Sequence, residues 1–166
     1  MRHLIVEEDM VVTVSHSGYI KRNAVSLYRA QRRGGKGATG MRPKDEDFVE
    51  RLFIASTHSY ILIFTNRGKV YWLKVHEIPQ AGRAAKGRPI VNLVRLGAEE
   101  NVTAILPVKE FVEGKYIVMA TRSGVIKKTD LMAFSRPRTG GIIALNLAEG
   151  DELMSARITD GTMNVF

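Results

Sequence analysis

The 166-residue chain has the composition of a soluble globular protein, with 45% hydrophobic and 25% charged residues. It has no cysteine, which excludes disulfides, thiolate metal sites and cysteine nucleophiles, and its four histidines are too scattered to form a metal site. No apolar run is long enough to span a bilayer, and residues 1–10 do not resemble a signal peptide. We therefore expect a cytosolic protein that does not bind membranes.

Lys and Arg outnumber Asp and Glu by 25 to 17, and the formal net charge is +8. The excess falls in three blocks, because residues 10–44 carry eight Lys or Arg and no acid, residues 67–88 net +5 and residues 122–138 net +4. The segment that follows each block is neutral or acidic, with a net charge of −3, −1 and −3. This alternation indicates a repeat that presents one basic segment per unit, an arrangement suited to an extended polyanion.

Three apolar stretches are each followed by a polar turn with a glycine and then by a second β-rich stretch, which is typical of a β-hairpin. The turns are Ser15–Gly18, Thr65–Gly68 and Thr121–Gly124. A second glycine follows each hairpin, at Gly37, Gly87 and Gly141. A further apolar segment then closes each unit, at residues 52–55, 103–106 and 154–158.

The segments between hairpin and closing strand contain further candidate strands, at residues 90–94 and 142–147, and short helical turns at 25–30 and 74–78. Four short strands in about 50 residues predict the blade of a propeller. The expected repeats are 10–56, 57–108 and 115–159, with the start of a fourth at 160–166. The sequence thus predicts an all-β fold, and the alternative is a sandwich or barrel whose hairpins are alike by coincidence.

The most distinctive motif is a heptad with three cations and three glycines, Gln31, Arg32, Arg33, Gly34, Gly35, Lys36 and Gly37. Glycines let a backbone approach phosphates closely, and arginine and lysine supply the charge at the same point. Residues 35–40 also match G-x-G-x-x-G, but they follow a polar run instead of a buried strand and do not lead into a helix. A P-loop is excluded because Lys36 is followed by glycine. The remaining alternative is a flexible solvated loop.

The heptad QRRGGKG, together with Glu8–Thr13, Gly87–Leu93 and Thr103–Val108, resembles the C-terminal domain of the gyrase A family, and the resemblance covers Leu4 to Phe166. It implies a β-pinwheel, a propeller-like ring whose four-stranded blades exchange strands with their neighbours and whose basic rim wraps DNA. About three of the family's usual six blades are expected here, as a single fragment of that domain over residues 1–166. The heptad is the part that the family needs for wrapping and hence for negative supercoiling. The equivalent domain of topoisomerase IV is the alternative, although its heptad is degenerate.

Double-stranded DNA is the expected partner, bound mainly through its phosphates. Aromatic residues do not interleave with the basic blocks, which disfavours single-strand binding, and Asn and Gln are sparse there, which argues against base readout. The candidate DNA-binding residues are the heptad, Gln31–Gly37, with Lys21, Arg22, Arg29, Arg67, Lys69, Arg83, Lys86, Arg88, Arg122, Lys127, Lys128, Arg136 and Arg138.

No catalytic constellation is evident, so the sequence assigns no catalytic residue, metal ligand or cofactor to this chain. The resemblance implies that the DNA-cleaving tyrosine, ATP and Mg²⁺ belong to other parts of an ATP-dependent type II topoisomerase. It also implies that the partners are the remainder of gyrase A and gyrase B in an A2B2 enzyme, in the bacterial cytoplasm at the nucleoid. A protein–protein docking propeller is the alternative from another functional class.

Overall fold

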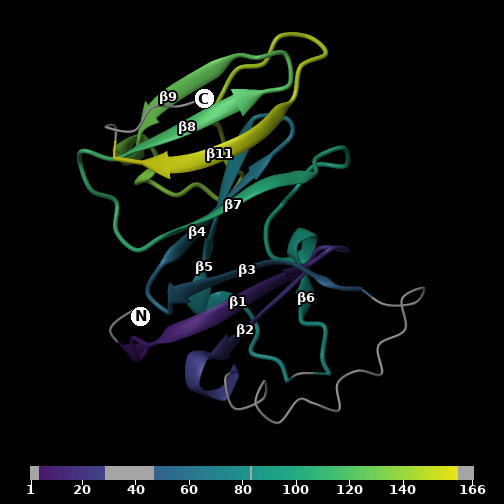
Figure 1. Cartoon of the computed structure of the whole chain (residues 1–166), viewed down its shortest axis with the longest axis vertical. Helices are drawn as coiled ribbons and strands as arrows, with labels where there is room; N and C mark the ends of the chain where they lie inside the picture. Colours follow the sequence, from purple (N-terminus) through teal and green to yellow (C-terminus); the bar gives the residue numbers. More distant parts are fainter. Residues whose placement is uncertain (1–3, 29–46, 83, 161–166) are drawn as a thin grey trace. The chain divides into compact units, whose positions relative to one another are not determined.

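The computed structural model describes residues 4–28, 47–82 and 84–160, which form three antiparallel sheets (Figure 1). The first sheet has the order β3-β1-β2-β6 and consists of β1 (Asp9–Ser15), β2 (Tyr19–Ala24), β3 (Val49–Ser56) and β6 (Arg88–Pro89). The second has the order β10-β5-β4-β7, with β4 (Tyr60–Thr65), β5 (Lys69–Lys74), β7 (Val102–Val108) and β10 (Ile142–Ile143). The third has the order β11-β8-β9, with β8 (Tyr116–Thr121), β9 (Ile126–Asp130) and β11 (Leu153–Thr159). The predicted all-β class is confirmed.

The three predicted hairpins are β1–β2, β4–β5 and β8–β9, and their turn glycines have positive φ. Within the described ranges, three short 3₁₀ helices lie outside the sheets, η4 (Val75–Glu77), η5 (Ile90–Asn92) and η6 (Leu131–Phe134). The first of them accounts for the helical turn predicted near residues 74–78.

The predicted strand at residues 90–94 is wrong, because η5 begins at Ile90 and only Arg88–Pro89 pair as a strand. The apolar Ile90 that suggested a strand is instead buried by the 3₁₀ turn, with 3% of its surface exposed. The prediction at residues 142–147 holds only for Ile142–Ile143. The backbone then leaves the sheet, since the N–H groups of Ala144 and Leu145 both bond to the carbonyl of Gly68.

The fourth strand of the first two sheets comes from the following repeat. β6 follows the second hairpin in sequence, yet it pairs with β2 of the first, with Tyr19 opposite Pro89 and Ile20 opposite Arg88. In the same way β10, which follows the third hairpin, pairs with β5 of the second. A four-stranded sheet is therefore completed only when two successive repeats fold together, as the resemblance implied.

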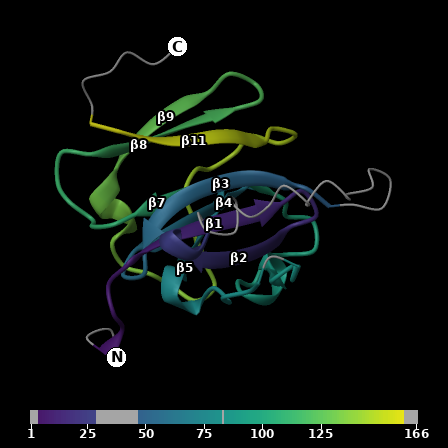
Figure 2. The same ribbon diagram turned by 60° about the horizontal axis from the view of Figure 1, so that its bottom comes forward.

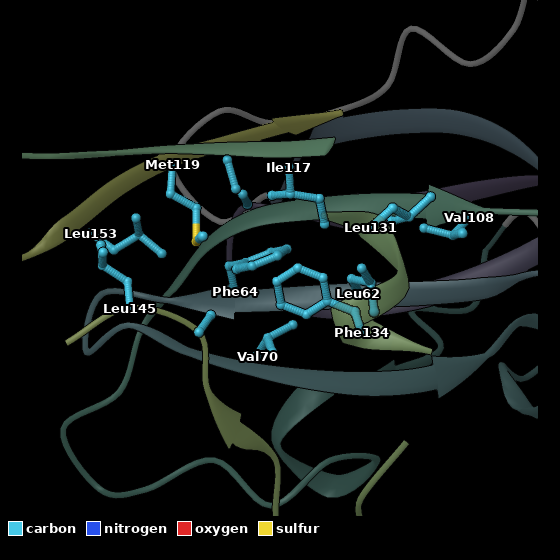
Figure 3. Packing of buried hydrophobic residues seen from close by; sticks show 13 residues of the cluster. Leu62, Phe64, Val70, Val108, Ile117, Met119, Leu131, Phe134, Leu145 and Leu153 are labelled. Carbon is cyan, nitrogen blue, oxygen red and sulfur yellow. The ribbon is translucent and has the colours of Figure 1, made fainter. Parts of the chain in front are cut away.

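The chain divides into two compact units, one from Met1–Ser59 with Lys74–Leu93 and the other from Tyr60–Leu73 with Val94–Phe166. The first sheet belongs to the first unit. In the second unit, β11, β8 and β9 lie side by side in both views (Figures 1 and 2). Side chains of β4, β8, η6 and β11 contribute to the core of this unit, as Figure 3 shows for Phe64, Met119, Phe134 and Leu153.

The strand β4 shows why the local sequence dictates burial. Its residues Ile61, Leu62, Ile63 and Phe64 are all fully buried, so both faces of the strand are covered. A continuous apolar run of this kind is typical of a strand between two packed layers, whereas alternation is typical of a strand with one wet face.

Hydrogen bonds join each hairpin turn to the residues just before the closing strand. In the first repeat, the Asp47 carboxylate accepts bonds from the Ser17 N–H (3.0 Å) and from the Ser17 hydroxyl. In the third, Asp151 accepts the same pair from Ser123, at 2.9 Å from N–H and 2.5 Å from Oγ. The backbone N–H groups of His16 and Arg122 also bond to the carbonyls of Phe48 and Glu152, at 2.8 Å each.

The second repeat closes its turn with different side chains. Arg67 replaces the turn serine, and the Asn66 Oδ1 accepts from the Asn101 N–H at 2.7 Å. Glu100 reaches inward instead, where it accepts bonds from the Thr65 hydroxyl (2.8 Å) and the Tyr71 hydroxyl. The geometry of the turn is thus retained by two different sets of side chains.

Replacing Gly87 by alanine is expected to destabilise the protein strongly. Gly87 has φ +90°, and an added Cβ would lie 2.2 Å from the carbonyl oxygen of Ile20, at the point where β6 pairs with β2. We expect a loss of about 2–4 kcal/mol in the free energy of unfolding, measured by urea denaturation.

Two further glycines separate the causes of that loss. Gly124→Ala has positive φ but nothing within 4 Å of the added Cβ, so it should show only the backbone strain. Gly82→Ala has neither feature and should be close to neutral. A Gly87→Ala protein no less stable than Gly82→Ala would contradict the close approach of the two repeats.

The hydrogen bonds accepted by Asp151 predict a loss of stability in acid. Hydrogen bonds from Ser123, then Thr121, hold the pKa of Asp151 at about 2, below its ordinary 3.8. The stabilisation from this carboxylate is therefore fully present above about pH 4 and is lost as the pH falls towards 2. We expect Asp151→Asn to lower the melting temperature at pH 7, and expect its difference from the wild type to shrink between pH 4 and 2.

The control for this experiment is Glu149→Gln, which removes one exposed charge from the same segment and leaves the hydrogen bonds to Asp151 in place. It should leave the melting temperature at pH 7 nearly unchanged. An Asp151→Asn protein whose melting temperature differed from the wild type equally at every pH would show that the charge of Asp151 is not what stabilises the turn.

Candidate nucleic-acid interface

The candidate interface consists of the cations that the sequence singled out. The heptad Gln31–Gly37, Arg29 and Arg83 lie outside the described residues, so their roles stay predictions. The remaining candidates are described, and they fall into two groups, those that are partly buried and bonded to the protein's own carbonyls and those that are exposed to solvent.

Lys21 and Arg22 belong to the first group. The Lys21 ammonium donates to the carbonyls of Gly82 (3.1 Å) and Ala85 (2.9 Å). The Arg22 Nε donates to the carbonyl of Ile78 at 2.6 Å. Burial lowers the pKa of both side chains below their ordinary values. The sequence could not show these bonds, because their acceptors lie more than 50 residues away in the next repeat, and the DNA-binding role of both residues stays a prediction.

Exposed cations of the second repeat stand beside this part of the first hairpin. Arg88 is exposed on β6, opposite Ile20 of β2. The Lys86 ammonium lies 5.4 Å from the ring centroid of Tyr19, within the range of a cation–π interaction. The second basic block therefore contributes cations to the first sheet.

The second unit repeats this arrangement with the third basic block. The Lys69 ammonium of β5 donates to the carbonyl of Gly140 at 3.2 Å and lies 5.1 Å from the ring of Tyr71. Arg136 and Arg138 are exposed on the segment that leads from η6 to β10, next to β5. In both units, a lysine of the hairpin bonds to the loop of the next repeat, and that loop carries exposed cations.

The third hairpin carries the last group of candidate cations. Lys127 and Lys128 are exposed on β9, and the Lys128 ammonium lies 4.4 Å from the ring of Tyr116. Arg122 is exposed at the turn but bonds to the Gly150 carbonyl (2.5 Å) and to Glu152 (3.5 Å). Its charge is therefore partly neutralised within the protein.

A hollow of about 570 Å³ lies between the second and third turns, within the second unit. Arg67 and Arg122 line it, but so do three acids, Glu149, Asp151 and Glu152. With more acids than cations around it, the hollow is unsuited to a phosphate group. The favourable surface for a polyanion is the exposed set on the loops and edge strands.

Neither a metal site nor a membrane span is found in the described part of the chain. Within residues 4–28, 47–82 and 84–160, no three His, Cys, Asp or Glu side chains come together in a way that could hold a metal ion. No helix among these residues is both long and apolar enough to cross a bilayer.

Sequence reasoning missed two features of this surface. The first is Asn23, a buried polar residue of β2 whose amide bonds to the next repeat. A buried Asn cannot be recognised from a strand sequence alone. The second is the acid before each closing strand, at Asp47, Glu100 and Asp151, whose recurrence after each basic block was a readable signal.

Comparison with known proteins gives one consistent family. The family described as "DNA gyrase C-terminal domain, beta-propeller" matches residues 9–56, 59–109 and 115–160. The DNA gyrase A protein of Aeromonas salmonicida is 56% identical over 98% of this chain, and that of Escherichia coli K12 is 53% identical over the whole chain. The chain spans about a fifth of the length of these relatives, namely 18% and 19%.

Solved structures share the fold over most of this chain. The C-terminal domain of DNA topoisomerase IV aligns with a TM-score of 0.77 and 28% identity, over 95% of this chain and 47% of that one. A DNA gyrase A C-terminal domain aligns with a TM-score of 0.65 and 28% identity, over 92% of this chain and 48% of that one. The two solved structures are equally similar to this chain in sequence, whereas the two gyrase A relatives are 56% and 53% identical, and the family match covers all three hairpins. The chain belongs to the DNA gyrase C-terminal domain family.

Proposed function

We propose that this chain binds double-stranded DNA through its phosphates and bends it, as the accessory DNA-wrapping part of a gyrase. One observation carries the proposal, namely that strand exchange places the exposed cations of one repeat beside the hairpin of the preceding repeat. Arg88 and Lys86 stand beside the first hairpin, and Arg136 and Arg138 lie on the loop that leads to β10, the strand that pairs with the second hairpin. A series of cations in this arrangement suits a long polyanion better than a single small anion.

The exposed side chains are better suited to contacts with phosphates than to contacts with bases. The exposed candidates are Lys and Arg on short loops and edge strands, and no helix long enough to enter the major groove is present in the described part of the chain. Specificity would then come from how easily a sequence bends. Bending costs on the order of 1–6 kcal/mol per 20–30 base pairs, so several well-separated contacts must act together.

Catalysis is proposed to belong to the rest of the enzyme. In this proposal strand cleavage, ATP hydrolysis and Mg²⁺ use reside in the remainder of gyrase A and in gyrase B, in the bacterial cytoplasm. The chain itself supplies binding and bending, with no cofactor of its own. A docking propeller for proteins would predict binding that is insensitive to the loss of surface cations, which separates the two functions experimentally.

Neutralising Lys86 and Arg88 together is expected to weaken DNA binding in a salt-dependent way. With six to nine phosphates neutralised, the logarithm of the binding constant for a 40-base-pair duplex should fall against the logarithm of salt with a slope of about −5 to −8. Lys86→Gln/Arg88→Gln should make this slope shallower by about 1–2, as measured by fluorescence anisotropy.

The matched control is Arg95→Gln/Lys109→Gln, which removes two exposed cations outside the basic blocks. It should change the slope by less than half as much. Equal effects of the two double variants would mean that net charge, and no particular surface, attracts the DNA. A slope shallower than about −2 for the wild type would count against DNA binding altogether.

Replacing Gln31–Gly37 by alanines should separate bending from binding. The change removes three charges, so binding should persist with a slope shallower by about 2–3. Bending should be lost if this segment is the point that holds the duplex while the other cations bend it. End-to-end fluorescence transfer on the same duplex measures bending, and supercoiling by a complete gyrase that carries the variant measures its consequence.

The control for the heptad is Arg95→Ala/Lys109→Ala/Lys115→Ala, which removes the same number of exposed charges elsewhere. This control should keep both bending and supercoiling. The role assigned to the heptad is wrong if the alanine variant supercoils DNA as well as the control does.

A further inference from the structure

Three consecutive side chains of β2 hold the basic loop of the next repeat. Asn23 donates from its amide to the carbonyl of Ala81 at 2.8 Å. Lys21 donates to Gly82 and Ala85, at 3.1 and 2.9 Å. Arg22 donates to Ile78 at 2.6 Å and to His76 at 3.2 Å. All five bonds run from first-repeat side chains to second-repeat carbonyls.

The backbone continues this attachment on both sides of the side-chain bonds. The Arg22 N–H donates to the carbonyl of Pro79 at 3.0 Å, and Arg22 forms a parallel bridge with Gln80. Further along, β6 pairs with the start of β2. The described part of the segment from His76 to Pro89 therefore follows β2 and ends at the exposed cations Lys86 and Arg88.

Apart from these side-chain bonds, the backbone bonds and the β6 pairing, little in the described part of this loop can fix its position. Gly82, Ala84 and Ala85 are exposed, and buried apolar anchors occur only at the ends, Ile78 and Ile90. A surface loop of small residues is mobile unless hydrogen bonds restrain it. Between these ends, the hydrogen bonds from β2 are what restrains the loop.

The second unit has an equivalent attachment, which indicates that it is a property of the repeat. Trp72 stands four residues after the turn glycine Gly68, as Arg22 stands four residues after Gly18. Its indole N–H donates to the carbonyl of Phe134 at 2.9 Å. Phe134 ends η6, and Ile78 directly follows η4, so the same position of the repeat bonds to an equivalent carbonyl.

We infer that Lys21, Arg22 and Asn23 are positioning residues for the phosphate-binding cations Lys86 and Arg88, through the five carbonyls to which they donate. The inference rests on the proposed DNA binding. Asn23 is the informative member, because it is neutral and only 6% exposed. Its replacement can disturb the loop without changing the charge of the DNA-binding surface.

The test measures binding of the 166-residue chain to a 40-base-pair duplex over a range of salt concentrations. Asn23→Ala should make the salt slope shallower by about 1–2, as Lys86→Gln/Arg88→Gln does, although no cation is removed. Affinity at 0.1 M salt should fall about three- to tenfold. Added to Lys86→Gln/Arg88→Gln, Asn23→Ala should change the slope no further, because the cations that it positions are already gone.

The control is Asn146→Ala, an exposed asparagine of the second unit, which should keep the wild-type slope. Should Asn23→Ala lose the fold, as judged by circular dichroism, Asn23→Thr serves instead, because threonine favours a strand and is too short to reach Ala81. Trypsin cleavage after Lys86 should also be faster in the Asn23 variant than in the control, which reports the loop directly without DNA.

The outcomes distinguish this inference from the function on which it rests. If Lys86→Gln/Arg88→Gln leaves the slope unchanged, the proposed phosphate contacts fail, whatever Asn23 does. The positioning role is overturned if that double variant makes the slope shallower while a folded Asn23 variant keeps the wild-type slope and the wild-type resistance to trypsin. A shallower slope for the Asn23 variant that adds fully to the double variant would also overturn it.

Discussion

The pairing of a two-residue strand with the hairpin of the preceding repeat is the interaction on which the rest of the structure depends. It requires the chain to approach a neighbouring backbone closely, which Gly87 and Gly141 permit because each has positive φ and no side chain. An added Cβ would lie 2.2 Å from the Ile20 carbonyl oxygen in one case and 2.8 Å from that of Val70 in the other. Stability and the placement of surface charge thus follow from the same contact.

This exchange changes what the charge pattern of the sequence means. Read along the chain, each basic block belongs to one repeat. In the fold, a hairpin is joined by the loop of the following repeat, so Lys86 stands beside Tyr19, and the Lys69 ammonium bonds to Gly140. Some cations then hold the joint while others remain exposed. Lys21 and Arg22 belong to the first kind, and Arg88, Arg136 and Arg138 to the second.

The local parts of this fold could be predicted from sequence, and the long-range parts could not. The hairpins and their glycine turns follow from apolar runs and turn residues that lie next to each other in the chain. The strand predicted at residues 90–94 failed because Ile90 is buried by a 3₁₀ turn, a choice made by packing and not by the β-propensity of isoleucine and valine. In the same way, the sequence could not show that Lys21 and Arg22 bond to carbonyls more than 50 residues away.

The acidic segments also acquire a physical explanation. The acid before each closing strand, Asp47, Glu100 or Asp151, is committed to hydrogen bonds at its turn. It therefore helps to close the turn, and it falls between the basic blocks because the turn and the closing strand meet there. Where the turn serine is replaced by Arg67, the carboxylate turns inward to Tyr71 and Thr65, and the arginine remains exposed. The alternation of charge along the sequence thus combines two separate demands, acids that close the turns and cations that the loops hold out to solvent.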